Sequence, residues 1–194
     1  MDKISNDSND ISNNSITISV IGKGSVGKTS IIYRFITGST LENPTPTLED
    51  NYKKYIEVEG QRFQINILDT SGEDEYQTLF DSWIRQSDGI ILTFAVDTNK
   101  SFKDLNTKYQ RILKNQIANE KKYPIILIGN KCDTNKREVT QKQAKNYADK
   151  IKASYFEVSA LTDENNNINA AFMKIAEKVL SKILKNKKDK CEIY

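Results

Sequence analysis

A glycine-rich loop that ends in lysine and threonine is the first feature of the chain that could do chemistry. It reads Gly22-Lys23-Gly24-Ser25-Val26-Gly27-Lys28-Thr29 and matches the spacing G-x-x-x-x-G-K-[ST]. Glycines let backbone N–H groups converge on an anion, while Lys28 brings positive charge to the β- and γ-phosphates and Thr29 offers a hydroxyl to Mg²⁺. The loop, with Ser30 directly after it, therefore predicts a site for a phosphorylated ligand.

A second polar segment, Asn130-Lys131-Cys132-Asp133, indicates which base is bound. It follows an apolar strand, so it should lie at the carboxyl edge of the sheet, where ligands bind. The Asp133 carboxylate can accept two hydrogen bonds from the N1–H and exocyclic amine of guanine, an arrangement that adenine does not offer. Asn130 and the stem of Lys131 would frame the ring. Alone, the segment reads as a polar turn; with the phosphate loop it predicts a guanine nucleotide.

These residues need a sheet and helices to position them. A strand over 16–21 enters the loop, and a helix over Lys28 to Thr37 leaves it. Alternation from Tyr52 to Leu68 predicts a hairpin around Glu59-Gly60-Gln61, and further strands are expected at 89–96, 124–128 and 155–158. Three more helices carry apolar faces: Phe102, Leu105, Tyr109, Ile112 and Leu113; Ala144, Tyr147, Ala148 and Ile151; Ile168, Phe172, Ile175, Val179 and Ile183. The alternation predicts a three-layer α/β fold, with six mostly parallel strands, one antiparallel edge strand and about five helices.

The length of 194 residues suits one domain. Residues 1–15 are rich in Asn, Ser and Asp and are predicted to be a disordered tail. Residues 16–184 form the expected domain, and residues 185–194 a lysine-rich tail.

Composition excludes several classes of function. The chain has no histidine, which removes imidazole general bases and Ser-His triads. Its net charge of +3 is too small to favour nucleic-acid binding. The two cysteines, Cys132 and Cys191, have no metal-ligand spacing, and the polar N-terminus lacks the apolar segment of a secretory signal. These features favour a cytoplasmic protein.

The chain resembles the Ras family of small GTPases from about Ile16 to Ile183. Five motifs occur in the order typical of that family: Gly22 to Thr29, Pro46 to Tyr52, Asp69-Thr70-Ser71-Gly72, Asn130 to Asp133, and Ser159-Ala160. The resemblance implies a P-loop NTPase fold and a slow GTPase, which switches between GTP and GDP forms with Mg²⁺ in signal transduction.

The resemblance also assigns roles around the phosphates. Thr47 should reach Mg²⁺ and the γ-phosphate, Asp69 should hold the metal through water, and Gly72 should donate its N–H to the γ-phosphate. The metal site would comprise Thr29, Thr47 and Asp69. The residues implied in catalysis are Lys28, Thr47, Gly72 and Glu73.

Base and partner contacts follow from the same resemblance. Ser159 and Ala160 should present backbone N–H groups to the guanine oxygen, with Leu161 standing where a lysine often follows. The segment from Thr47 to Tyr52 should bind effector proteins in the GTP form. A guanine nucleotide exchange factor and a GTPase-activating protein are the other implied partners.

Several positions depart from the pattern. Glu73 replaces the glutamine that positions the attacking water, and an ionised carboxylate can accept from that water but cannot donate to the transition state. Ser25 and Ser71 add hydroxyls near the phosphates. The phenylalanine that stacks on guanine in many relatives has no counterpart, since its place falls near Thr40 and Leu41. These changes bear on hydrolysis and on nucleotide retention.

The chain ends in Cys191-Glu192-Ile193-Tyr194, which partly matches a prenylation signal. The lysines before it, which would provide a second signal for an anionic membrane, are Lys182, Lys185, Lys187, Lys188 and Lys190. We expect a location on the inner face of the plasma membrane, and an unmodified, solvated tail is the alternative.

Two other functions remain open at this point. Glu73 and Ser71 fit a module that holds GTP and rarely hydrolyses it. An ATP-dependent kinase is disfavoured by Asp133 and by the lack of an evident site for a second substrate.

Overall fold

The computed structural model describes residues 15–73, 76 and 78–191. The predicted disordered tail lies outside these residues up to position 14, as do the last three residues of the possible prenylation signal. The chain forms a sheet of six strands in the order β2-β3-β1-β4-β5-β6. Only the β2–β3 pair is antiparallel among the strand pairs of the described residues. The predicted three-layer α/β fold is confirmed.

Strands and helices alternate along the chain after the first hairpin. The strands are β1 (Ser15–Gly22), β2 (Glu49–Val58), β3 (Gln61–Thr70), β4 (Gly89–Ala95), β5 (Ile125–Asn130) and β6 (Ser154–Glu157). The helices are α1 (Lys28–Thr37), α2 (Phe80–Gln86), α3 (Asn99–Ala118), α4 (Gln141–Lys150) and α5 (Asn167–Cys191).

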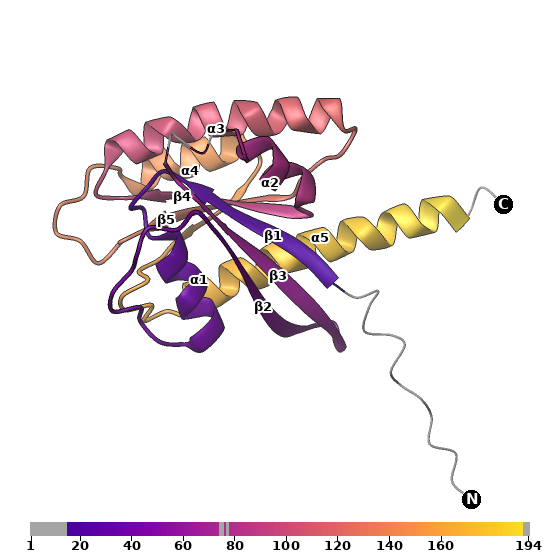
Figure 1. The fold of residues 1–194 in the computed structure, drawn as a ribbon, viewed down its shortest axis with the longest axis horizontal. Coiled ribbons are helices and arrows are strands. Elements are labelled where there is room, and N and C mark those ends of the chain that lie inside the picture. The colour runs from indigo at the N-terminus through magenta and orange to yellow at the C-terminus, as the bar shows by residue number, and fades with distance from the viewer. Residues whose placement is uncertain (1–14, 74–75, 77, 192–194) are drawn as a thin grey trace, which may run out of the picture.

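Helices cover both faces of the sheet (Figure 1). α1 and α5 pack on one face, where the rings of Phe35 and Phe172 stack with centroids 4.0 Å apart. α2, α3 and α4 pack on the other face, around Trp83, Phe94 and Ile112. β4 and β5 are buried along their whole length, as expected for central parallel strands. The two cores fix β1, β4 and β5, whose carboxyl ends carry the candidate site.

Three boundaries differ from the sequence prediction. The hairpin turn is only Glu59-Gly60, both with positive φ (51° and 75°), and Gln61 pairs with Val58 instead of lying in the turn. β1 begins one residue earlier, at Ser15, because it pairs with Gln64. β5 continues to Asn130, which pairs with Ala95 and accepts a hydrogen bond from the Val96 N–H at 2.9 Å. Asn130 therefore ends the strand rather than following it.

Two helices also differ. α2 was not predicted as a separate helix, although Phe80, Trp83 and Ile84 are its buried residues. α5 runs on to Cys191, so the tail expected from residue 185 begins as a continuation of the helix. α5 extends past the edge of the sheet toward the C-terminus (Figure 1). No helix in the described part of the chain is long and apolar enough to cross a membrane.

Candidate nucleotide-binding site

The phosphate loop connects β1 to α1, as the sequence predicted. Gly27 precedes α1 with φ 90°, a left-handed conformation that side chains rarely adopt. A Cβ at Gly27 would also collide with the Asn130 side chain. No side chain of the described residues caps α1, so the first N–H groups of the helix remain available to an anion.

Lys28 lies almost buried at the start of α1, with 7% of its surface exposed. Its Nζ donates to the carbonyl oxygen of Lys23 at 3.2 Å. Burial lowers the pKa of Lys28 to about 8, against the opposing effect of the nearby Asp69 carboxylate. Desolvation makes the ammonium a stronger partner for phosphate oxygens than a surface lysine would be.

Three oxygen-bearing side chains meet beside Lys28. The Thr29 hydroxyl donates to Asp69 Oδ2 at 2.6 Å and lies 3.0 Å from the Thr47 hydroxyl. Asp69 is fully buried, and its Oδ1 has no hydrogen-bond partner among the described residues. Burial raises the pKa of Asp69, although the Thr29 hydrogen bond opposes the shift.

This oxygen set fits Mg²⁺, which prefers one or two carboxylates together with hydroxyl, phosphate and water oxygens. The described residues hold no cluster of three or more His, Cys, Asp or Glu that could form an all-protein metal site. Thr29, Thr47 and Asp69 would therefore hold the ion together with the nucleotide. The ion would neutralise charge on the phosphates.

The segment after β3 is tied directly to the phosphate loop. The Gly24 N–H donates to the Gly72 carbonyl oxygen at 3.0 Å, and a Cβ at Gly72 would collide with Gly24 N and Lys23 C. The Glu73 carboxylate lies over Gly24, since a Cβ added there would strike Oε1 of Glu73. A carboxylate thus faces the place that the γ-phosphate of a bound nucleotide would approach.

Two pockets adjoin across this edge of the sheet. The phosphate pocket has a volume of about 420 Å³. It is lined by Gly24, Ser25, Gly27, Lys28, Thr29, Ser30, Pro44, Thr45, Pro46, Thr47, Thr70, Ser71, Gly72, Glu73 and Lys131. The base pocket, of about 350 Å³, is lined by Gly27, Ser30, Thr40, Leu41, Asp97, Asn130, Lys131, Asp133, Thr134, Ala160 and Leu161. Gly27, Ser30 and Lys131 line both pockets, so one nucleotide could span them.

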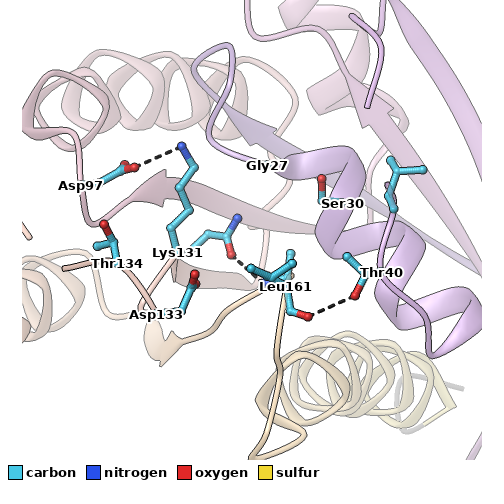
Figure 2. Close-up of a pocket in the computed structure, with 11 residues that line it drawn as sticks. Gly27, Ser30, Thr40, Asp97, Lys131, Asp133, Thr134 and Leu161 are labelled. Carbon is cyan, nitrogen blue, oxygen red and sulfur yellow. Dashed lines mark hydrogen bonds and ion pairs between the residues drawn. The ribbon is translucent and has the colours of Figure 1, made fainter. Parts of the chain in front are cut away.

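Figure 2 shows how the base pocket is built. Lys131 has φ 65°, and its Nζ pairs with Asp97 at 3.3 Å. This contact holds the lysine stem along one side of the pocket, with Asp133 and Thr134 nearby (Figure 2). Asp133 thus lies where a carboxylate could accept hydrogen bonds from guanine.

Asn130 makes two internal hydrogen bonds that the sequence did not predict. It is 2% exposed, its Nδ2 donates to the Val26 carbonyl oxygen at 2.9 Å, and its Oδ1 accepts from the Ala160 N–H at 3.0 Å. The amide therefore braces the phosphate loop against the Ser159-Ala160 loop. Asn130 also lines the base pocket, where it was expected to frame the ring. The Ala160 N–H, expected to meet the guanine oxygen, donates in this structure to the Asn130 side chain.

Five of the expected residues line neither pocket: Gly22, Lys23, Val26, Asp69 and Ser159. Some of them contact residues that do. Ser159 is an example, because its hydroxyl accepts from the N–H groups of Leu161 and Thr162 at 3.2 and 3.1 Å. The remaining expected residues are brought together in the two pockets.

Sequence reasoning missed Asp97 and Arg34. Asp97 follows β4, at the same sheet edge as the other motifs, which is a signal that could have found it. Arg34 lies on α1 and reaches the loop at Thr162, a contact that no spacing rule predicts.

Comparison with known proteins fits this geometry. The sequence model of the Ras family matches residues 17–181. The chain belongs to the Ras family. A Ras-like protein of Dictyostelium discoideum, Ras-like protein rasU, is 37% identical over 175 residues, which cover 90% of this chain and 79% of that protein.

Membership of the Ras family carries general properties. Ras-family proteins are small GTPases that bind GTP, GDP and Mg²⁺, generally hydrolyse GTP, and act as GTP switches. They generally interact with effectors, exchange factors and activating proteins. The two adjoining pockets and the oxygen set near Lys28 are the parts of this chain that suit those properties.

Proposed function

We propose that this chain is a signalling switch that hydrolyses GTP slowly and recruits effectors only in the GTP form. The observation that supports this most directly is the meeting of two segments at the phosphate pocket. Thr47 reaches Thr29 at 3.0 Å, and Gly72 accepts from Gly24 at 3.0 Å. A γ-phosphate and its Mg²⁺ would hold both segments, and loss of the γ-phosphate would release them.

The effector surface would be the segment from Thr47 to Tyr52. Its Leu48 side chain is 50% exposed, and Glu49 and Asp50 are also exposed. β2 is an edge strand of the sheet, so it could add a strand from a partner. The two carboxylates favour a partner with a basic surface.

The geometry supports the following proposed roles for the site residues. Lys28 and the start of α1 would bind the phosphates, and Thr47 with Gly72 would contact the γ-phosphate. Glu73 can accept a proton or a hydrogen bond from the attacking water. No arginine lies between residues 39 and 47, so an arginine finger would come from an activating protein, and hydrolysis without it would be on the order of 10⁻⁴ per second.

Nucleotide content and single-turnover hydrolysis test the proposal. Protein purified without added nucleotide should contain GDP, and loaded GTP should turn over once with Mg²⁺ and more slowly with EDTA. Asp133→Asn should weaken guanine binding selectively, because it removes the carboxylate acceptor. Bound ATP, or equal affinity for ATP and GTP, would contradict the proposal.

A second candidate function follows from Glu73. Its carboxylate lies in the phosphate pocket near Gly24 and Lys28, and it cannot donate to the transition state while ionised. A module that holds GTP and rarely hydrolyses it would be purified with GTP, and its turnover would rise in Glu73→Gln. We also expect Glu73 to weaken the response to an activating protein. Equal stimulation of the unmodified chain and of Glu73→Gln by an activating protein would contradict this expected effect of Glu73.

We also propose that the C-terminus binds the inner face of the plasma membrane. Lys182 lies beside Lys121 and Lys122, and burial together with Lys121 lowers the pKa of Lys182. Positive charge is therefore already concentrated at the end of the domain. A lipid on Cys191 would supply the second signal that stable anchoring needs. The intact mass of the protein from its own cells, with flotation on phosphatidylserine vesicles, tests this; an unmodified mass contradicts the lipid.

A further inference from the structure

Two side chains join the segment after α1 to the loop after Ser159-Ala160. The Thr40 hydroxyl donates to the Leu161 carbonyl oxygen at 3.1 Å (Figure 2). Arg34 donates from Nη1 to the Thr40 hydroxyl at 2.8 Å and from Nη2 to the Thr162 carbonyl oxygen at 2.7 Å. The two bonds to Leu161 and Thr162 join residues more than a hundred positions apart in the sequence, and the third links Arg34 to Thr40 within the first segment.

We propose that Arg34 and Thr40 form a clasp that closes the base pocket and slows the release of guanine nucleotide. The clasp stands at the place where this chain lacks a stacking aromatic ring. This inference rests on the proposed guanine-nucleotide binding and adds to it the residues that set nucleotide retention. Arg34 and Thr40 are positioning residues, because they act on the walls of the pocket and not on the phosphates.

The position of the clasp supports this role. Thr40 and Leu41 line the base pocket from one side, and Leu161 lines it from the other. Figure 2 shows Thr40 and Leu161 approaching each other beside the pocket. A base held near Asp133 could leave more easily if these two walls moved apart, and the clasp opposes that movement.

The chemistry of the clasp also limits its opening. Arg34 uses two nitrogens of one planar guanidinium, so both bonds hold the same side chain in one orientation. Its two acceptors are a hydroxyl already bonded to the loop and a backbone carbonyl of that loop. Loss of the Thr40 hydroxyl therefore removes two of the three bonds.

The chain offers matched variants for a test. Thr40→Val keeps the shape of the side chain and removes the hydroxyl, whereas Thr40→Ser keeps the hydroxyl. Arg34→Lys keeps the charge but cannot donate from two guanidinium nitrogens to Thr40 and Thr162. Thr37→Val is the control, because the Thr37 hydroxyl bonds only within its own segment, to Tyr33 and Ser39, among the contacts of the described residues.

The measurement is the release rate of a fluorescent GDP analogue from the full chain after addition of excess GDP. With Mg²⁺ present, we expect about tenfold faster release from Thr40→Val, since two hydrogen bonds of ordinary net strength are lost. Arg34→Lys should also release faster, while Thr40→Ser and Thr37→Val should remain within about twofold of the unmodified chain. The acceleration in Thr40→Val should persist in EDTA, because the clasp acts on the base side and not through the metal.

The outcomes separate the clasp from the proposed function. Equal release rates from Thr40→Val, Arg34→Lys and the unmodified chain would overturn the clasp while leaving guanine binding intact. Equally fast release from Thr40→Ser and Thr40→Val would also overturn it, because the hydroxyl would then have no role. Failure of the unmodified chain to bind the analogue would overturn the proposed function and the clasp together. Thermal unfolding of each variant checks that the fold is retained.

Discussion

The indole Nε1 of Trp83 donates a hydrogen bond to Oε2 of Glu49 at 2.6 Å, joining α2 to the first residue of β2. Trp83 is 2% exposed and packs in the core between α2 and the sheet. Glu49 is an exposed residue of the segment proposed to bind effectors. The orientation of that carboxylate therefore depends on the position of α2. The segment proposed to bind effectors is thus tied to α2 through Glu49 and to the phosphate loop through Thr47.

Glu49→Ala should loosen both partners of this hydrogen bond. We expect faster amide exchange in the first residues of β2 and in α2, with a loss of about 1 kcal/mol in the free energy of unfolding. Hydrogen exchange followed by mass spectrometry measures the first effect and denaturant unfolding the second. Glu49→Gln keeps an acceptor oxygen and should lie near the unmodified chain. Unchanged exchange in Glu49→Ala would show that the contact does not couple the segments.

Glu73→Gln should raise the affinity for GTP relative to GDP. The Glu73 carboxylate lies in the phosphate pocket beside Gly24, and a γ-phosphate adds negative charge there. Two like charges about 6 Å apart at a solvent-accessible site repel by roughly 1 kcal/mol, so we expect a change of about three- to tenfold in the affinity ratio. Competition of the two nucleotides against a fluorescent analogue measures the ratio.

Glu57→Gln is the control for this experiment. It removes the same charge from an exposed position near the end of β2, away from both nucleotide pockets. A similar change of the GTP-to-GDP affinity ratio in Glu57→Gln would assign the effect to the net charge of the protein. An unchanged ratio in Glu73→Gln would exclude repulsion between Glu73 and the γ-phosphate.

The order of the elements was predictable because each core strand and long helix carries its own periodic pattern. β4 and β5 were recognised from apolar runs, and α5 from a helical stripe. α2 has the same kind of pattern in Phe80, Trp83 and Ile84, but its seven residues are too few to stand out. Short helices depend on the core that receives them more than on their own sequence.

The site was predictable only where a motif holds its residues close in sequence. The phosphate loop and the segment from Asn130 to Asp133 are of that kind. The Trp83–Glu49 and Arg34–Thr162 contacts join residues 34 and 128 positions apart, and no local pattern encodes such pairs. The bracing role of Asn130 was missed for the same reason, since both of its partners come from other loops.

Gly72→Ala and Gly24→Ala should differ sharply although both add one methyl group near the phosphates. At Gly72 the methyl meets backbone atoms of Lys23 and Gly24, which cannot move without opening the phosphate loop. At Gly24 it meets the end of the flexible Glu73 side chain. We expect Gly72→Ala to lose about 2–4 kcal/mol of stability or the equivalent nucleotide affinity, and Gly24→Ala less than about 1 kcal/mol. Thermal unfolding and GDP affinity measure both, and equal losses would contradict the assignment of the two contacts.

Nucleotide affinity should decline as pH rises through the pKa of Lys28. Burial lowers that pKa to about 8 from 10.5, whereas phosphate oxygens beside the ammonium would raise it again. Below about pH 8 the free protein already carries the charge, so affinity should change little. Above it, binding must take up a proton, and affinity should fall by up to about tenfold per pH unit. The same lowered pKa affects the stability of the nucleotide-free protein. Below about pH 8, burying the charged Lys28 lowers the free energy of unfolding, and this destabilisation decreases as the pH rises from about 8 toward 10.5.

Calorimetry in two buffers of different ionisation enthalpy measures this linkage. At about pH 8 we expect the uptake of about half a proton per GDP bound, and at about pH 7 much less. Lys28→Arg should bind more weakly but lose the dependence between about pH 7 and 9, because a guanidinium stays protonated there. Burial raises the pKa of the Cys132 thiol, which reduces the contribution of that group to proton exchange near pH 8. A pH dependence that persists in Lys28→Arg would assign the proton to another group.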